Sequence, residues 1–315
     1  MNLAPGILGP ATLLIAMALI NGGFARRVAG QPNQTSDQIV VGIDGHCRVG
    51  CWTAVRSTEN HSIKSIETRD GDGVRVRYRF DQPSAWGYAI PGSEAAPLIV
   101  DGEDETVVRT RFPVIGSPAR GPAMIPREMR WVIALGDPLG IDTIGANELL
   151  GRDAKIAVSK PSDPTSLPDS VLGYDGVDMM VIGKSSQALL GGLDQKQQAA
   201  IRDWISDGGY LVLTLGKSSK QLLEVAPWLL ELLPLDQVTT AQIDPSALEN
   251  YTATQSPLDS FVGIRLPRDR GRVLVLGRTN RRVSTPLAVG YNVGFGTALV
   301  IAADLEDPLF AQWPE

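Results

Sequence analysis

The sequence predicts a mixed α/β protein in which a small β-sandwich domain precedes a domain with a parallel sheet. Three observations lead to this prediction. The chain has 315 residues, which suits about two domains of ordinary size. Short strands with no helical pattern between them fill residues 38 to 126. Apolar strands that alternate with helical segments fill residues 127 to 315.

The composition restricts the function. Hydrophobic residues make up 43% of the chain and charged residues 20%, which excludes collagen, coiled coil and disorder. Lys and Arg total 29 while Asp and Glu total 35, so the net charge is -6. A nucleic-acid binder has to neutralise phosphates, and we therefore expect no nucleic-acid partner. With 2 Cys and 2 His, few residues are available for metal or thiol chemistry, and no cofactor or metal is expected.

An uncharged apolar segment lies near the N-terminus. Residues 5 to 25 carry no charge, and residues 6 to 20 are apolar enough to enter a bilayer, so residues 1 to 30 are predicted to be a signal peptide or a signal anchor. Small residues at 28 to 30 suit cleavage, and residues 31 to 37 form a short tether. We therefore expect the rest of the chain outside the cytoplasm, either secreted or periplasmic, or anchored by this segment.

Six runs between residues 38 and 126 have the alternating or β-branched character of strands. They are residues 39–41, 52–55, 62–67, 74–80, 97–100 and 106–112. Asp70 to Gly73 predicts a hairpin turn, since the later ligands of a calcium loop are missing. Cys47 and Cys51 either remain two thiols or form one local disulfide, which requires a turn at Val49 and Gly50.

A stretch rich in Gly and Pro at residues 116 to 126 predicts the boundary between the two domains. Four apolar strands follow, at residues 131–135, 155–158, 177–182 and 210–215. Because they are continuously apolar, they predict a parallel sheet with helices on each side. Asp194 and Gln197 form a capping box for one helix, and a second helix is expected from Lys220 to Leu233. Further strands at 272–276, 285–291 and 297–302 follow, the last two as a hairpin at the sheet edge.

Four segments of the second domain form a series. Tyr174 to Gly183 contains a strand, Leu193 to Trp204 a helix, and Asp207 to Leu213 a strand that begins after two glycines. The chain then ends in a Gly-Phe-Gly turn and the strand that leads to Leu305. Together these segments resemble the class I glutamine amidotransferase-like domain, as found behind a β-domain in predicted bacterial envelope proteins. The resemblance implies a flavodoxin-like sheet for residues 127 to 315.

Enzymes of that family carry a Cys in a sharp turn after the strand that follows the two glycines, and a His near the C-terminus. Here Leu215 and Gly216 stand at the nucleophile position, and no His follows His61. Neither residue can attack a carbonyl, and this domain has no imidazole to act as the base. The resemblance therefore implies a catalytically empty domain, and we predict that the protein is not an enzyme.

Two Gly-Lys-Ser-Ser sequences follow neighbouring predicted strands, at Gly183 to Ser186 and at Gly216 to Ser219. Both lack the earlier glycine of a phosphate-binding P-loop. They nevertheless lie at the carboxyl ends of parallel strands, where open α/β sheets bind ligands and where Lys and Ser favour anions. The alternative is that Gly turns the chain while Lys and Ser are solvated and cap the helices. The candidate ligand-binding residues are Asp137, Lys184, Ser185, Lys217 and Ser218.

Arginine is concentrated between residues 265 and 282. The candidate interaction face is made of Arg265, Arg268, Arg270 and Arg272. Such a patch on an acidic protein suits an acidic partner or lipid head groups. The alternative is a solvated face whose charges protect a strand edge from aggregation.

These observations predict a non-catalytic binding or scaffolding protein outside the cytoplasm, at the cell envelope. The expected partner is an envelope protein, and membrane association through the N-terminal apolar segment stays open. Two alternatives remain. One is a hydrolase that uses a nucleophile other than the family's, such as Ser218 or Ser219 beside Lys217. The other is a sensor of an anionic small molecule at the strand ends.

Overall fold

A computed structural model describes residues 38–58, 61–116, 122–137, 156–234, 238–246, 257–278 and 284–311, together with Glu249. Residues Thr35–Glu315 form one compact unit. The apolar segment and the tether predicted for residues 1 to 37 lie outside the described residues. Among the residues that are described, no helix is long and apolar enough to cross a membrane.

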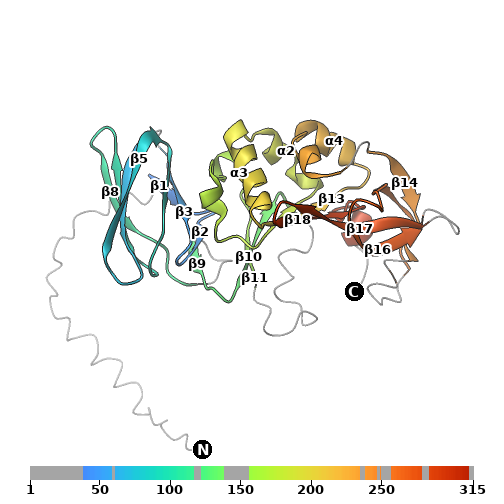
Figure 1. Cartoon of the computed structure of the whole chain (residues 1–315), viewed down its shortest axis with the longest axis horizontal. Helices are drawn as coiled ribbons and strands as arrows, with labels where there is room; N and C mark the ends of the chain where they lie inside the picture. The colour runs from blue at the N-terminus through green and yellow to red at the C-terminus, as the bar shows by residue number, and fades with distance from the viewer. Residues whose placement is uncertain are drawn as a thin grey trace, which may run out of the picture. The chain divides into compact units, whose positions relative to one another are not determined.

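The first part of the described chain folds into strands (Figure 1). One antiparallel sheet has the order β1-β3-β6, with β1 at Ile39–Val41, β3 at Thr53–Ser57 and β6 at Trp86–Ala89. A second has the order β5-β4-β7-β8, with β5 at Arg75–Ser84, β4 at Ile63–Arg69, β7 at Pro97–Gly102 and β8 at Val107–Arg111. Alternate residues of both sheets share one apolar core, to which Val55, Ile66 and Leu98 contribute. The six predicted strands are thus present, while an independent β-sandwich domain stays a prediction.

Three strands in this first part of the chain were not predicted from the sequence. They are β2 at His46–Arg48, β6, and β9 at Ala123–Ile125. Strand β9 lies inside the predicted Gly-Pro linker and pairs in parallel with β2, with His46 opposite Ala123. Three-residue strands are too short to show an alternation, which is why composition concealed β9 although Met124 is fully buried.

The predicted hairpin turn is present, and so is the turn that a Cys47–Cys51 disulfide would require. In the hairpin between β4 and β5, the Asp70 carboxylate accepts hydrogen bonds from the backbone N–H groups of Asp72 and Val74, at 3.0 and 2.9 Å. The chain also turns between Arg48 and Cys51, where Gly50 has a φ of 74° that favours glycine. Both cysteines are free thiols, and Cys47 is buried.

The second part of the chain forms a seven-stranded sheet with the order β11-β10-β12-β13-β18-β17-β16. The strands are β10 at Arg130–Leu135, β11 at Ile156–Ser159, β12 at Met179–Ile182, β13 at Tyr210–Thr214, β16 at Arg272–Arg278, β17 at Ser284–Val293 and β18 at Gly296–Ile301. The four predicted parallel strands are confirmed, and β18 joins them in parallel beside β13. The predicted hairpin is β17–β18, but β16 and not the hairpin forms the sheet edge.

Helix α3, at Gln195–Ser206, has the predicted capping box. The Asp194 carboxylate accepts from the Gln197 backbone N–H at 2.8 Å, and the Gln197 side-chain oxygen accepts from the Asp194 N–H at 3.0 Å. Ile201, Trp204 and Ile205 are buried, as their spacing predicts.

The single helix predicted from Lys220 to Leu233 is wrong. Helix α4 spans Ser219–Val225, and α5 spans Leu229–Leu232. Pro227 has no N–H to donate and disfavours helical geometry at Ala226, where the backbone adopts a φ of -126° and a ψ of 66°. The apolar pattern therefore continues through a break in the helix.

Helices α3 and α4, together with α2 at Gln187–Gly191, cover one face of the sheet (Figure 1). The core on that face joins sheet residues such as Ile133, Leu211 and Val300 to α3, to α4 and to α2. On the opposite face Val132, Ala134 and Val181 form a smaller cluster to which no described helix contributes. The prediction of helices on both faces therefore holds for the face that α2, α3 and α4 cover, and residues 138–155 lie outside the described residues.

Candidate functional site

The candidate site lies where the parallel strands β10, β12, β13 and β18 end. Their register aligns Leu135 with Ile182, Ile182 with Leu213, and Leu213 with Val300. The chain segments that follow these strands therefore meet at one edge of the sheet. Two of these segments are the Gly-Lys-Ser-Ser loops, and a third is the acidic segment after β18, which contains Asp304, Glu306 and Asp307.

Asp304 holds the loop that follows β13. One carboxylate oxygen accepts from the Gly216 N–H at 2.8 Å. The other accepts from the Ser218 N–H at 3.0 Å and from the Ser218 hydroxyl at 2.7 Å. Asp304 is 4% exposed and Ser218 is 5% exposed, so these bonds are shielded from water. Buried polar groups need hydrogen-bond partners, and the Asp304 carboxylate accepts three hydrogen bonds from this loop.

Glu306 holds the loop after β12 in a similar way. The Ser185 N–H donates to Glu306 Oε2 at 2.7 Å. Gly183 allows this approach, because a Cβ atom at that position would lie 2.0 Å from Glu306 Oε1. The Ser185 hydroxyl in turn accepts from the Asp137 N–H at 2.7 Å, which ties the loop to the end of β10.

The structure brings most of the predicted ligand-binding residues together at this edge. Lys217 forms an ion pair with Asp307, with 2.6 Å between Nζ and Oδ2. The exposed Asp137 carboxylate pairs with Lys160 at 2.7 Å, beyond the end of β11. Lys184 is exposed and begins a short 3-10 turn.

The three carboxylates that organise the site were not predicted from the sequence. Asp304 lies in the C-terminal segment that resembles the amidotransferase-like family, but this resemblance does not show what the Asp304 side chain does. Its partner Gly216 is 88 residues away in the chain, so no local pattern connects the two.

The surroundings of Glu306, Lys217 and Asp307 shift the pKa of each of these side chains. Burial raises the pKa of the Glu306 carboxyl, against the opposite effect of its hydrogen bond from Ser185. Its Oε1 atom is buried and has no hydrogen-bond partner among the described residues. The hydrogen bond between Lys217 and Asp307 raises the pKa of the lysine and lowers that of the aspartate. Lys217 thus stays charged and neutralised by its neighbour.

An open pocket of about 300 Å³ adjoins this network. Lys217, Asp304 and Asp307 contribute its polar side. The rings of Phe261 and Phe310 meet edge to face, with centroids 5.1 Å apart. The remaining lining residues are Gln242, Ser260, Val262 and Leu309. A concave site with an apolar surface and a few convergent polar groups is typical of small-molecule binding.

Several elements build the other wall of that pocket. Strand β14 at Thr240–Ile243 pairs with β15 at Phe261–Ile264, and α7 spans Pro308–Ala311. Gly263 bridges to Gly216 of the loop after β13. A Cβ atom at Gly263 would lie 2.1 Å from the Ala302 carbonyl oxygen, so glycine allows β15 to approach the end of β18.

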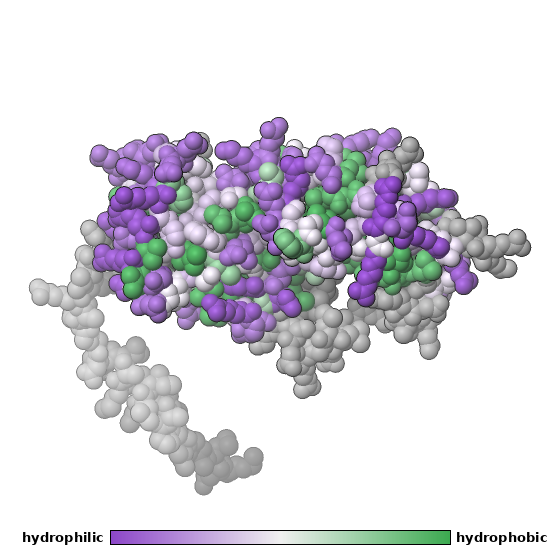
Figure 2. Space-filling view, in the orientation of Figure 1, coloured by the Kyte–Doolittle hydropathy of each residue, from purple (hydrophilic) through white to green (hydrophobic). Residues whose placement is uncertain are grey.

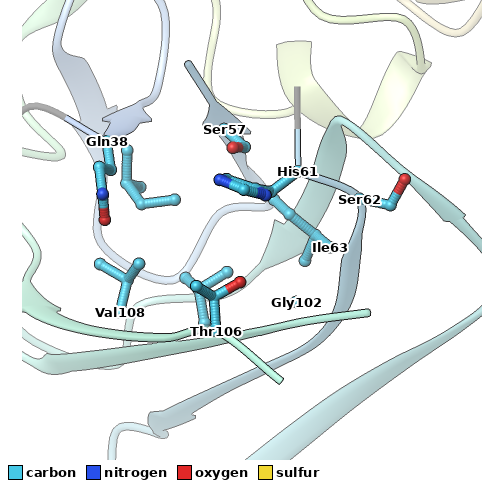
Figure 3. A pocket seen from close by; sticks show the side chains of 10 residues that line it. Gln38, Ser57, His61, Ser62, Ile63, Gly102, Thr106 and Val108 are labelled. Atoms are coloured by element: carbon cyan, nitrogen blue, oxygen red, sulfur yellow. The ribbon is translucent and has the colours of Figure 1, made fainter. Parts of the chain in front are cut away.

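A second cavity, of about 20 Å³, lies among the strands of the first part of the chain. Figure 3 shows the side chains of Gln38, His61, Thr106 and Val108 around it. The His61 Nδ1 atom lies 2.8 Å from a carboxylate oxygen of Asp104. A cavity of this size holds about one water molecule, so it is not a ligand site.

The positions expected for a family nucleophile have structural functions. Leu215 is fully buried, and its N–H donates to the Ile301 carbonyl oxygen at 2.8 Å. Among the described residues, no group of three or more His, Cys, Asp or Glu side chains could hold a metal ion. Burial raises the pKa of the Cys47 thiol to about 12, so this thiol is protonated and not nucleophilic at neutral pH.

The predicted arginine face lies on the segment between β15 and β16. Arg265 follows β15, Arg268 and Arg270 lie in the connecting loop, and Arg272 begins β16; all are exposed. The Arg270 guanidinium lies 3.5 Å from the Pro234 carbonyl oxygen. The later arginines of the run, at 281 and 282, lie outside the described residues.

Comparison with known proteins gives no family. No protein-family model and no curated protein sequence matches the chain. Similar solved structures include the cytoplasmic protein STM3548 from Salmonella typhimurium, with 15% identity over 59% of this chain and 93% of that chain and a TM-score of 0.36. A putative thua-like protein from Bacteroides uniformis has 14% identity over 58% of this chain and 85% of its own, with a TM-score of 0.34.

An exo-beta-1,4-mannosidase from Opitutaceae bacterium strain TAV5 has 13% identity and a TM-score of 0.35, and its match spans 59% of this chain and 33% of the mannosidase. Similarity at this level carries no information about substrate or partner. The amidotransferase-like resemblance therefore stays a prediction.

Proposed function

We propose that this chain is a non-catalytic binding protein that takes a small ligand in the pocket at the ends of β13 and β18. The observation that carries the proposal is the composition of that pocket. The Lys217–Asp307 ion pair provides polar contacts beside an apolar surface that includes Phe310 and Leu309. The buried Asp304 adds a negative charge behind them.

The charge of the pocket favours a neutral or cationic ligand over an anion. The backbone N–H groups of Gly216, Ser218 and Ser185, which could have bound an anion, donate to the chain's own carboxylates. Lys217 is neutralised by Asp307. An incoming anion would have to displace a carboxylate that the fold already holds in place, so the anion-sensor alternative has little support.

The hydrolase alternative also has little support. The Ser218 hydroxyl donates to Asp304, and the same carboxylate oxygen accepts from the Ser218 N–H. A serine nucleophile needs a base that takes its proton, usually a histidine, and the whole sequence has no histidine after His61. The proposed protein therefore binds its ligand without turning it over.

Three aromatic probes of similar shape test the proposal. Benzylamine, benzyl alcohol and benzoate differ mainly in charge, and their binding is measured by NMR chemical shifts and thermal stabilisation. We expect benzylamine or benzyl alcohol to bind and benzoate to bind more weakly. Phe310→Ala should abolish binding, while Leu274→Ala, on the exposed part of β16, should not change it. Preferred binding of benzoate, or equal loss in both variants, would overturn the proposal.

We also propose that the protein acts at the cell envelope, outside the cytoplasm, with an envelope protein as partner. The apolar segment at residues 6 to 20 and the arginines at 265 to 272 support this part of the proposal. Mass spectrometry of the mature N-terminus, with cross-linked capture from host membranes, tests it. Recovery of an intact N-terminus from the soluble cytosolic fraction would contradict it.

A further inference from the structure

A second charged surface lies on the four-stranded sheet β5-β4-β7-β8. The register places Arg69 opposite Arg75 and Glu67 opposite Arg77. Across β7, Ile99 pairs with both Glu67 and Arg109, so Arg109 belongs to the same face. We call this surface the sheet arginine face; it consists of Arg69, Arg75, Arg77, Arg79, Arg109 and Arg111.

These arginines point to solvent. The alternate residues of the same strands, such as Tyr78, Leu98 and Val108, pack into the core instead. The Arg75 side chain is 76% exposed and that of Arg77 is 48% exposed. Figure 2 shows mainly hydrophilic side chains, with a few apolar ones, over the part of the surface where β5 and β8 lie.

The positive charge of this face is only partly balanced. Glu67 forms ion pairs with Arg77 at 2.8 Å and with Arg75 at 3.9 Å. Within the described part of the chain, Arg69, Arg109 and Arg111 form no ion pair. Like charges directly opposite on neighbouring strands destabilise a sheet, so the Arg69–Arg75 pair lowers the stability of the free protein.

Protection of sheet edges does not explain the whole face. Charges on β5 and β8 can prevent edge-to-edge aggregation, because both are edge strands. Arg69, however, lies on β4, which is an interior strand. A second copy of the chain that docked on this face by two-fold symmetry would bring arginine against arginine. The repulsion between these charges disfavours a symmetric dimer through this face.

We propose that the sheet arginine face binds an acidic segment of a partner protein, whose Asp and Glu side chains pair with the guanidinium groups. Guanidinium and carboxylate groups match in bidentate geometry. Successive arginines on one strand lie about 7 Å apart, which equals the spacing of alternate side chains in an extended peptide. This inference is independent of the ligand pocket.

One further feature favours an acidic peptide over a phosphate polymer. The half-buried Ile99 lies between the rows of arginines and offers an apolar contact. Four short strands span only about 15 Å, which suits a segment better than a whole folded surface.

Fluorescence anisotropy with a labelled poly-glutamate peptide and the full-length chain in a mild non-ionic detergent tests the proposal. We expect binding that weakens with added salt. The double variant Arg69→Thr, Arg111→Thr should bind roughly tenfold more weakly, since Thr suits exposed strand positions and the fold is kept. The control Lys196→Gln, Lys220→Gln, which removes two exposed positive charges on α3 and α4, should bind as the unmodified chain does.

Three results would overturn this assignment. They are absence of binding to the peptide, equal weakening in the control variant, and tighter arginine-dependent binding of single-stranded DNA or of phosphatidylglycerol vesicles. Far-UV circular dichroism of each variant verifies that the fold is intact. Because both variants leave the strand-end pocket unchanged, probe binding there reports separately on the proposed function.

Discussion

The buried carboxylate of Asp304 offers the sharpest test of how the strand-end site is held together. Asp304→Asn keeps the size of the side chain but replaces one acceptor oxygen by a donor NH2 group. The native carboxylate accepts from the Gly216 N–H, the Ser218 N–H and the Ser218 hydroxyl. Whichever way the amide turns, its NH2 group faces at least one backbone N–H. The Ser218 hydroxyl can rotate and accept, but a backbone N–H cannot.

The magnitude follows from these bonds. A buried donor left without a partner costs about 1–3 kcal/mol, and a hydrogen bond to a charged acceptor contributes about 1.5–3 kcal/mol. Since the substitution also removes the cost of burying a charge, we expect the free energy of unfolding to fall by about 2–4 kcal/mol. The matched control is Asp307→Asn, which weakens the ion pair with Lys217. The Lys217 side chain is 58% exposed, so this control should cost at most about 1 kcal/mol.

Urea unfolding followed by tryptophan fluorescence measures both variants, since the chain has 6 Trp. Hydrogen exchange adds a local measurement, because the amides of Gly216 and Ser218 should exchange faster in Asp304→Asn than in the control. Equal losses of stability in the two variants would refute the reasoning, as would unchanged exchange at both amides.

Three further predictions concern single groups. Because burial raises the pKa of Glu306, its contribution to stability is present at low pH and is lost as the pH rises through that pKa. Urea unfolding from acidic to neutral pH should therefore show a decline in stability, and Glu306→Gln should flatten that decline. An unchanged pH profile in the variant would argue against this prediction. In the folded chain Cys47, with a pKa raised to about 12, should resist iodoacetamide while the half-buried Cys51 reacts first, and peptide mapping that finds equal rates contradicts this. Asp194→Ala should lower the free energy of unfolding by about 1 kcal/mol through loss of the cap that it forms with Gln197, whereas Asp194→Ser should cost little, and urea unfolding compares the two.

Local signals predicted the elements that depend on local chemistry. The capping box of Asp194 and Gln197 fixes the start of α3 through bonds between neighbours in sequence. The four apolar strands of the sheet were predictable because burial on both faces leaves a continuous run. Short β9 and the break at Pro227 show the limits of the same method. Strand β9 is stabilised by pairing with a strand that is distant in the sequence. At Pro227, a single proline breaks a helix although the apolar pattern continues.

The surfaces were harder to predict because they depend on register. Alternating arginines at 75, 77 and 79 are visible in the sequence, but Arg69 and Arg109 join them only through pairing across β4 and β7. The arginines at 265 to 272 attracted attention because they are close in sequence, although they lie in a loop and at the start of an edge strand. A cluster of arginines along the sequence is therefore a poor guide to where arginines cluster on the surface of a sheet.

The strand-end loops show why residue types alone misjudge a ligand. Lys, Ser and free backbone N–H groups at strand ends predict an anion, and the structure does hold an anion there, namely the carboxylate of Asp304. Because this carboxylate belongs to the same chain, its effective concentration at the loop far exceeds that of a free metabolite, so a dissolved anion cannot displace it. Selectivity must then come from the groups that still face the pocket. The Lys217–Asp307 pair and the surface around Phe310 remain accessible, and these would decide which molecule binds.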